Sequence, residues 1–150
     1  MKLEDESRTL SWIVLAAAGI AVMGIGSYFI FLRPPLLPED LRFLALPASQ
    51  LDIVRPRLEL WLAHVFMVLG GYAVATGALT ISLAATSFRA HSRGAAIGVS
   101  IGGAVSIGLM AAVNFAIASD FKWVILGVAL LWLCSLVLFW LETRNERTNR

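Results

Sequence analysis

Residues 123–141 read WVILGVALLWLCSLVLFWL and contain no Lys, Arg, Asp or Glu. Three further stretches have the same character, namely Ser11 to Leu32, Leu60 to Phe88 and Gly94 to Ser119. An uncharged apolar run of about 18 or more residues is long enough to cross the hydrocarbon core of a bilayer as a helix. The sequence therefore predicts an all-α fold, in which a single domain forms a four-helix bundle within the membrane.

The composition of the 150-residue chain agrees with this prediction, since 59% of the residues are hydrophobic and only 15% are charged. The basic residues lie at the ends of the apolar runs and form no patch, so the net charge of +2 does not indicate a nucleic-acid partner. The single cysteine, Cys134, can form neither an internal disulfide nor a CxxC pair. This excludes the four-helix membrane thiol oxidoreductases.

The distribution of basic residues predicts the orientation of the four spans. The two termini and the second loop lie on one side and carry seven Lys or Arg, whereas the other side carries five. The short basic turn from Phe88 to Arg93 adds to this difference, because short basic loops are retained in the cytoplasm. We therefore expect both termini to be cytoplasmic.

The one long connection, residues 33–59, is expected on the extracytoplasmic side. Arg33-Pro34-Pro35 ends the first span, and Pro38-Glu39-Asp40 is typical of a helix start, since proline suits the first helical position and acids there complement the helix dipole. A short amphipathic surface helix is predicted there, followed by a second helix that starts near Ser49 and ends or kinks at Pro56. The segment forms either a lid over the bundle end or a docking surface or gate over a cavity.

Small residues form a stripe along one face of the third span. The stripe comprises four residues at every fourth position, Gly94, Gly98, Gly102 and Ser106. In lipid, small residues allow helix backbones to approach closely and gain van der Waals contact. We expect the stripe to pack against the other helices of the bundle. The alternative is a homodimer seam or a docking site for a larger membrane complex.

Two polar residues within the spans suggest a candidate site. His64 lies about one turn inside the second span and Asn114 about one turn before the end of the third, so both are expected at a similar depth near the extracytoplasmic face. Glu59 and Asp120 belong to the same end. The first hypothesis is an interhelical hydrogen bond between His64 and Asn114. The alternative is a small polar cavity, lined by all four residues, that binds a proton, an ion or a headgroup.

The sequence lacks the residues that several kinds of membrane protein and enzyme require. A four-helix cytochrome with two haems needs four histidines, whereas this chain has only His64 and His91, expected at opposite membrane faces. The sequence contains no metal-ligand spacing, phosphate-binding loop or GxSxG elbow. Small multidrug exporters rely on an acid in the first span, and this span has none. The sequence therefore predicts no enzyme, no catalytic residue, no cofactor and no metal site.

Two loop strings, Arg33 to Phe43 and Ser119 to Trp123, resemble those of uncharacterised bacterial four-helix membrane proteins, and the overall plan resembles that of small DoxX-like proteins. This resemblance implies an inner-membrane location. The glycine stripe and the scarcity of buried ionisable groups favour a structural or accessory subunit that associates with itself or with a larger assembly. The alternatives are a small transporter or channel that uses the His64 and Asn114 end, and a redox accessory protein.

Overall fold

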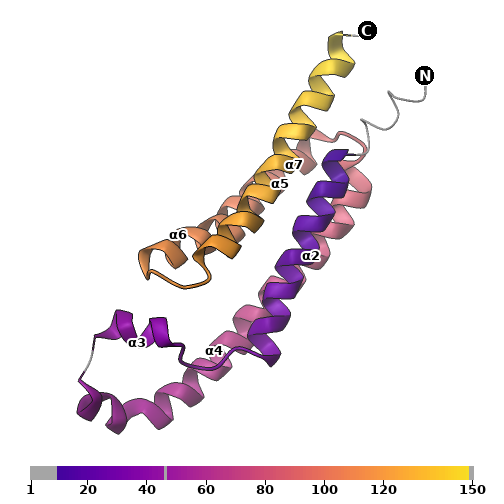
Figure 1. Ribbon diagram of the computed structural model, residues 1–150. Coiled ribbons are helices and arrows are strands. Elements are labelled where there is room, and N and C mark those ends of the chain that lie inside the picture. Colours follow the sequence, from indigo (N-terminus) through magenta and orange to yellow (C-terminus); the bar gives the residue numbers. More distant parts are fainter. Residues whose placement is uncertain (1–9, 46, 149–150) are drawn as a thin grey trace.

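The computed structural model describes residues 10–45 and 47–148, and in these residues it contains helices and no strand (Figure 1). Within these residues, four helices are long and apolar enough to cross a membrane, which confirms the all-α prediction and indicates a multi-pass membrane protein. The elements follow in the order α2 (Leu10–Phe31), α3 (Pro38–Leu44), α4 (Ala48–Leu83), the π-helix η1 (Ala84–Phe88), α5 (Arg93–Gly103), the π-helix η2 (Ala104–Gly108), α6 (Leu109–Ala116) and α7 (Lys122–Thr148).

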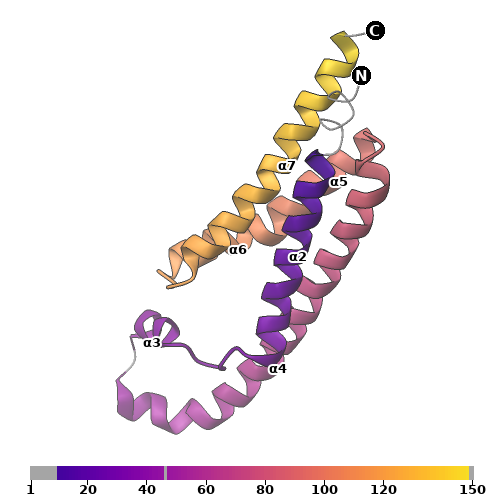
Figure 2. The same ribbon diagram turned by 45° about the vertical axis from the view of Figure 1, so that its right-hand side comes forward.

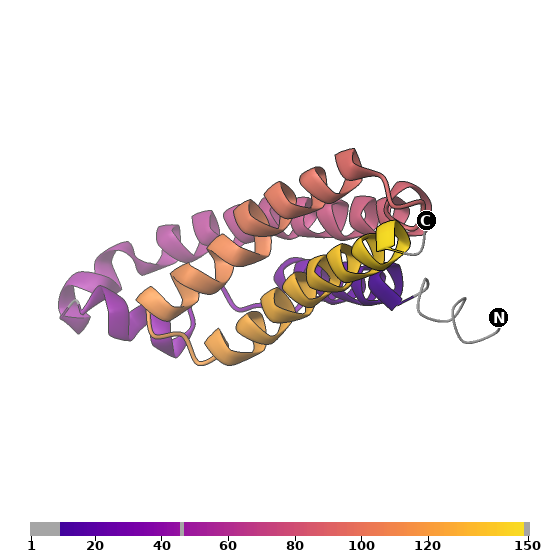
Figure 3. The same cartoon turned by 90° about the horizontal axis from the view of Figure 1, so that it is seen from above.

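The long helices form two groups that meet at one end and diverge at the other. Helix α2 lies along α4, and α7 packs against α2 near the end where α2 begins and α7 finishes (Figures 1 and 2). The third span, built from α5, η2 and α6, runs beside α7 (Figure 3). The short helix α3 lies at the diverging end, between α4 and the connection from α6 to α7. A cavity, described below, lies between the two groups of helices where they diverge.

Two pairs of glycines bring α2 and α4 into close contact. A Cβ atom on Gly26 would lie 2.6 Å from the carbonyl oxygen of Gly70, and one on Gly77 would lie 2.5 Å from that of Gly19. No side chain fits at these distances, so the two backbones themselves form the contact. The two glycines on each helix are seven positions apart, and a step of seven residues returns to nearly the same helix face. One antiparallel alignment of α2 and α4 therefore forms both contacts.

The three glycines of the stripe in the third span contact no other helix, whereas Ser106 at its end lines the cavity between the diverging helices. A Cβ atom on Gly98 or Gly102 would meet no atom within 4 Å, and Gly94 is exposed. Ser106 donates its hydroxyl to the Gly102 carbonyl of its own helix. The expected packing of the stripe within the bundle is therefore not found in the part of the chain that the structure describes. The third span instead buries a neighbouring face, which includes Ala95, Val99 and Gly103.

Gly103 allows the third and fourth spans to meet. The buried Trp132 donates a 3.0 Å hydrogen bond from Nε1 to the carbonyl oxygen of Val99. A Cβ atom on Gly103 would overlap with this indole ring. The absence of a side chain at Gly103 therefore lets the indole reach the backbone, which satisfies a polar N–H group that would otherwise be buried without a partner.

The second span begins earlier than the charge-free run predicts. Helix α4 runs from Ala48 through Pro56 without ending there, and it curves in its N-terminal part (Figures 1 and 2). Proline removes one hydrogen bond of the helix, and a helix tolerates this loss by bending. Of the two outcomes expected at Pro56, an end or a kink, the helix end is therefore wrong.

Candidate functional site

The structure does not bring the predicted pair of polar residues together. His64 is exposed on α4, and its Nδ1 atom pairs with the Leu60 carbonyl oxygen at 2.7 Å. Asn114 donates from Nδ2 to the Met110 carbonyl oxygen at 2.9 Å. Each side chain thus pairs with the preceding turn of its own helix, as short polar side chains in helices commonly do. The predicted interhelical hydrogen bond is not formed.

Glu59 and Asp120 each have a charged partner elsewhere. Glu59 pairs with Arg55 one turn earlier in α4 at 2.7 Å, and Asp120 pairs with Arg42 of α3 at 3.0 Å. All four side chains are exposed, and such ion pairs contribute about 0–1 kcal/mol to stability. The four predicted residues therefore do not form one polar site. Of them, Asn114 alone lines the cavity between the diverging helices.

This cavity has a volume of about 750 Å³, within the usual range of small-molecule sites. Helices α2, α4, α6 and α7 supply a mostly apolar wall that includes Ile25, Leu69, Val113 and Val128. The connection after α2, the helix α3 and the connection before α7 supply polar side chains at one end, which are Arg33, Glu39, Asp40 and Ser119. The cavity thus combines a long apolar wall with one polar end.

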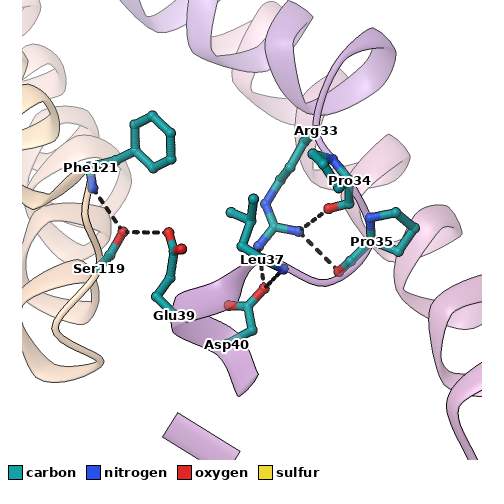
Figure 4. A network of polar contacts seen from close by, with 8 residues as sticks. All are labelled: Arg33, Pro34, Pro35, Leu37, Glu39, Asp40, Ser119 and Phe121. Carbon is teal, nitrogen blue, oxygen red and sulfur yellow. Dashed lines mark hydrogen bonds and ion pairs between the residues drawn. The ribbon is translucent and has the colours of Figure 1, made fainter. Parts of the chain in front are cut away.

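Arg33 organises the polar end of the cavity. Its guanidinium donates to the two carbonyl oxygens of Pro34-Pro35 at 2.9 and 3.2 Å and to Oδ2 of Asp40 at 3.0 Å (Figure 4). Oδ2 of Asp40 also accepts a 2.9 Å hydrogen bond from the backbone N–H of Leu37. The guanidinium carbon lies 3.5 Å from the ring centre of Phe66, a cation–π contact with α4. These contacts hold the start of α3 against the diverging end of α4.

Glu39 lies at the same end and is only 3% exposed. Its Oε1 atom accepts a long hydrogen bond of 3.4 Å from the Ser119 hydroxyl, which itself accepts from the backbone N–H of Phe121 at 3.1 Å (Figure 4). An ionised carboxylate offers about four acceptor positions. The contact with Ser119 therefore leaves most of the hydrogen-bonding capacity of Glu39 unused within the described part of the chain.

The sequence pattern predicted only where helices end and begin near these residues. It placed Arg33 at the end of the first span and Glu39 and Asp40 at the start of a surface helix, and both boundaries are confirmed. The available signal was an arginine directly after an apolar span, followed by two acids beside prolines. The burial of Glu39 has no counterpart in the local sequence, because it depends on contact with the distant connection at Ser119.

A second polar cluster joins the start of α2 to the last part of α7, at the end of the molecule away from the cavity. Glu142 accepts hydrogen bonds from the backbone N–H and the hydroxyl of Ser11, at 3.1 and 2.5 Å. His91, in the turn after η1, lies 3.2 Å from the same carboxylate and 3.4 Å from that of Glu146. These contacts connect three segments of the chain where the helices converge. Their role in the fold is to hold this end closed while the other end diverges.

Comparison with known proteins adds no assignment to these sites. No protein-family model, curated protein or solved structure matches this chain. The likeness to DoxX-like proteins therefore stays a prediction. The four apolar helices and the partly polar cavity are the features from which a function is inferred.

Proposed function

We propose that this chain is a small accessory protein of the inner membrane that holds an amphipathic molecule between its two groups of helices. The observation that carries this proposal is the cavity of about 750 Å³, which is apolar along most of its wall and polar at one end. An apolar tail fits the wall formed by the spans, and a polar head fits the end beside α3. Sites of this kind use a few placed polar groups to orient a mostly apolar ligand.

The distribution of basic residues supports an orientation for this site. Seven Lys or Arg on the side of the termini, against five on the other, favour cytoplasmic termini. The start of α2 and the end of α7 lie at the same end of the molecule, and α3 lies at the other (Figure 1). In this orientation the polar end of the cavity faces the outer leaflet. An amphipathic molecule in that leaflet would then have its head at the depth of α3.

The position of α3 favours a role beyond that of a simple lid. The helix contributes Glu39 and Asp40 to the wall of the cavity, whereas its apolar residues Phe43 and Leu44 are exposed. An apolar outer surface suits contact with the membrane interface. Of the two interpretations left open by the sequence, a gate over a cavity therefore fits the arrangement of α3 better.

Gly24 allows a test that leaves the contact between α2 and α4 intact. It lines the cavity, and a Cβ atom there would meet no atom within 4 Å. We expect Gly24→Trp to fill part of the cavity and to weaken the binding of hexadecanol about tenfold, equivalent to about 1.4 kcal/mol. Binding is measured with radiolabelled hexadecanol on the full chain in dodecyl maltoside micelles, with protein-free micelles as the background.

Gly127 provides the matched control for this experiment. It lies on α7 outside the cavity, and a Cβ atom there would also meet no atom within 4 Å. Gly127→Trp should therefore bind hexadecanol as the unmodified chain does. Equal binding by the unmodified chain and both variants would show that the cavity is not the binding site. An absence of specific binding of both hexadecanol and hexadecylamine by the unmodified chain would refute the proposed function itself.

The outward glycine stripe favours a second candidate function, which is association with a second copy or with a larger membrane complex. Gly98 and Gly102 present open backbone on one face of α5, and small residues of this spacing promote close helix contact in lipid. We expect the double variant Gly98→Ile, Gly102→Ile to keep the fold and to lose any oligomer. Crosslinking in native membranes and size-exclusion chromatography measure this. Unchanged oligomer in the double variant would exclude the stripe as the seam.

A further inference from the structure

We infer that the cavity selects an amphipathic molecule whose head is a positively charged amine, with Glu39 as its counter-ion. This inference rests on the proposed function, because it names the class of molecule that the cavity holds. Three features of the cavity support it, namely the balance of charges at the polar end, the aromatic rings of Tyr28 and Phe121 on the wall and the unused acceptor positions of Glu39.

The charges that line the cavity leave one carboxylate unbalanced. Three charged residues contribute to the wall, Arg33, Glu39 and Asp40. Arg33 pairs with Asp40 at 3.0 Å, and its side chain is 7% exposed, so these two charges neutralise each other. Among the residues that the structure describes, no cationic side chain forms an ion pair with Glu39. The polar end therefore has an excess of one negative charge.

A buried carboxylate without a cationic partner is unfavourable, and a ligand that supplies a positive charge can reduce this cost. Glu39 is only 3% exposed, so it meets little bulk water, and the 3.4 Å contact with Ser119 replaces little of what water supplies. An alkylammonium head offers opposite charge and up to three N–H donors, like the side chain of lysine. A carboxylate head would place a second negative charge beside Glu39. A hydroxyl head would donate only one hydrogen bond and would leave the charge unbalanced.

The surroundings of Glu39 also suit a cation. The rings of Tyr28 and Phe121 line the cavity with their centres 6.1 Å apart, and Phe121 follows Ser119 in the connection that faces Glu39 (Figure 4). Cations are attracted to the faces of aromatic rings. Asn114, whose Nδ2 donates one hydrogen bond to the Met110 carbonyl oxygen, also lines the cavity, and its amide has an acceptor oxygen as well as a second N–H. Acceptors and aromatic rings together match an ammonium group better than an anion.

Three probes with one tail and different heads test this inference on the full chain in dodecyl maltoside micelles. They are hexadecylamine, hexadecanol and hexadecanoate. We expect the unmodified chain to bind the amine most tightly and the carboxylate most weakly. Glu39→Gln keeps the shape of the side chain and removes its charge, so it should weaken amine binding about tenfold while hexadecanol binding changes less than about twofold. Glu59→Gln is the matched control, because Glu59 pairs with the exposed Arg55 away from the cavity.

The outcomes separate this inference from the proposed function. Equal binding of all three probes by the unmodified chain, lost in Gly24→Trp, would leave the cavity as a binding site and overturn its selection of amines. An equal loss of amine and alcohol binding in Glu39→Gln would also overturn it. If Glu39→Gln does not fold, as judged by its thermal unfolding, competition between amine and alcohol on the unmodified chain decides. Preferential retention of the alcohol would refute the inference.

A last measurement distinguishes two sources of the ammonium group. Phosphatidylethanolamine is added to the unmodified chain loaded with radiolabelled hexadecylamine. Displacement of the amine identifies a lipid headgroup as a source of the ammonium. Retention identifies a free long-chain amine as the preferred ligand. Both results support Glu39 as the counter-ion.

Discussion

Replacing Gly77 with isoleucine is expected to force α2 and α4 apart and to destabilise the bundle strongly. A Cβ atom on Gly77 would overlap with the Met23 side chain and would lie 2.5 Å from the carbonyl oxygen of Gly19. The Gly19 carbonyl oxygen belongs to the backbone of α2, so it can move away only if the whole helix shifts. Insertion of side-chain atoms into a packed core costs about 1–3 kcal/mol, and we expect a loss at the upper end of this range.

Thermal unfolding in detergent measures this effect, and a second variant repeats it independently. Gly26→Ile should act in the same way, because a Cβ atom there would lie 2.6 Å from the Gly70 carbonyl oxygen. Gly71→Ile is the matched control, since it adds the same side chain to an open face of α4. If Gly77→Ile and Gly71→Ile unfold at the same temperature, the glycine pairs do not hold α2 against α4.

The second large effect is expected for Gly103→Ala, a change of one methyl group. The new methyl group would overlap with the indole of Trp132 and push Nε1 away from the Val99 carbonyl oxygen. Overpacking costs about 1–3 kcal/mol. A buried N–H group that loses its acceptor adds about 1–3 kcal/mol. Even this small substitution should therefore loosen the contact between the third and fourth spans.

A neighbouring glycine provides the control for this prediction. Gly102→Ala changes the adjacent residue, where a Cβ atom would meet no atom within 4 Å, and should leave the unfolding temperature within error. Replacing Trp132 with phenylalanine removes the N–H group, so Gly103→Ala should cost less in that background than in the unmodified chain. Equal unfolding temperatures for Gly102→Ala and Gly103→Ala would contradict the proposed role of Gly103.

The two groups of glycines show why helix packing was predicted less well than helix formation. The regular four-residue spacing from Gly94 to Ser106 predicted the packing face of the third span, yet its three glycines contact no other helix. The contacts that hold α2 against α4 instead use a seven-residue spacing, Gly19 with Gly26 and Gly70 with Gly77. Each spacing places small residues on one helix face. Which face meets a neighbour depends on how the helices cross, and that is not a property of either segment alone.

The candidate site shows the same limit. The sequence placed His64, Asn114, Asp120 and Glu59 at one end of the bundle by depth, and depth does not specify the direction in which a side chain points. His64 proved to be exposed on α4, whereas Asn114 lines the cavity. Glu39 became the most informative charged residue because the chain folds α3 against the connection at Ser119, 80 positions away.

Three features were predictable from local sequence, namely the four apolar helices, the end of the first span before Arg33-Pro34-Pro35 and the start of α3 at Pro38. These features follow from length, hydrophobicity and proline chemistry within short segments, so no distant contact is needed to predict them. The tertiary structure alone decided the close approach of α2 and α4, the divergence of the other helices and the burial of Glu39. Each of these depends on packing between distant segments, where small differences in crossing angle decide whether a helix face meets a neighbour, a cavity or the membrane.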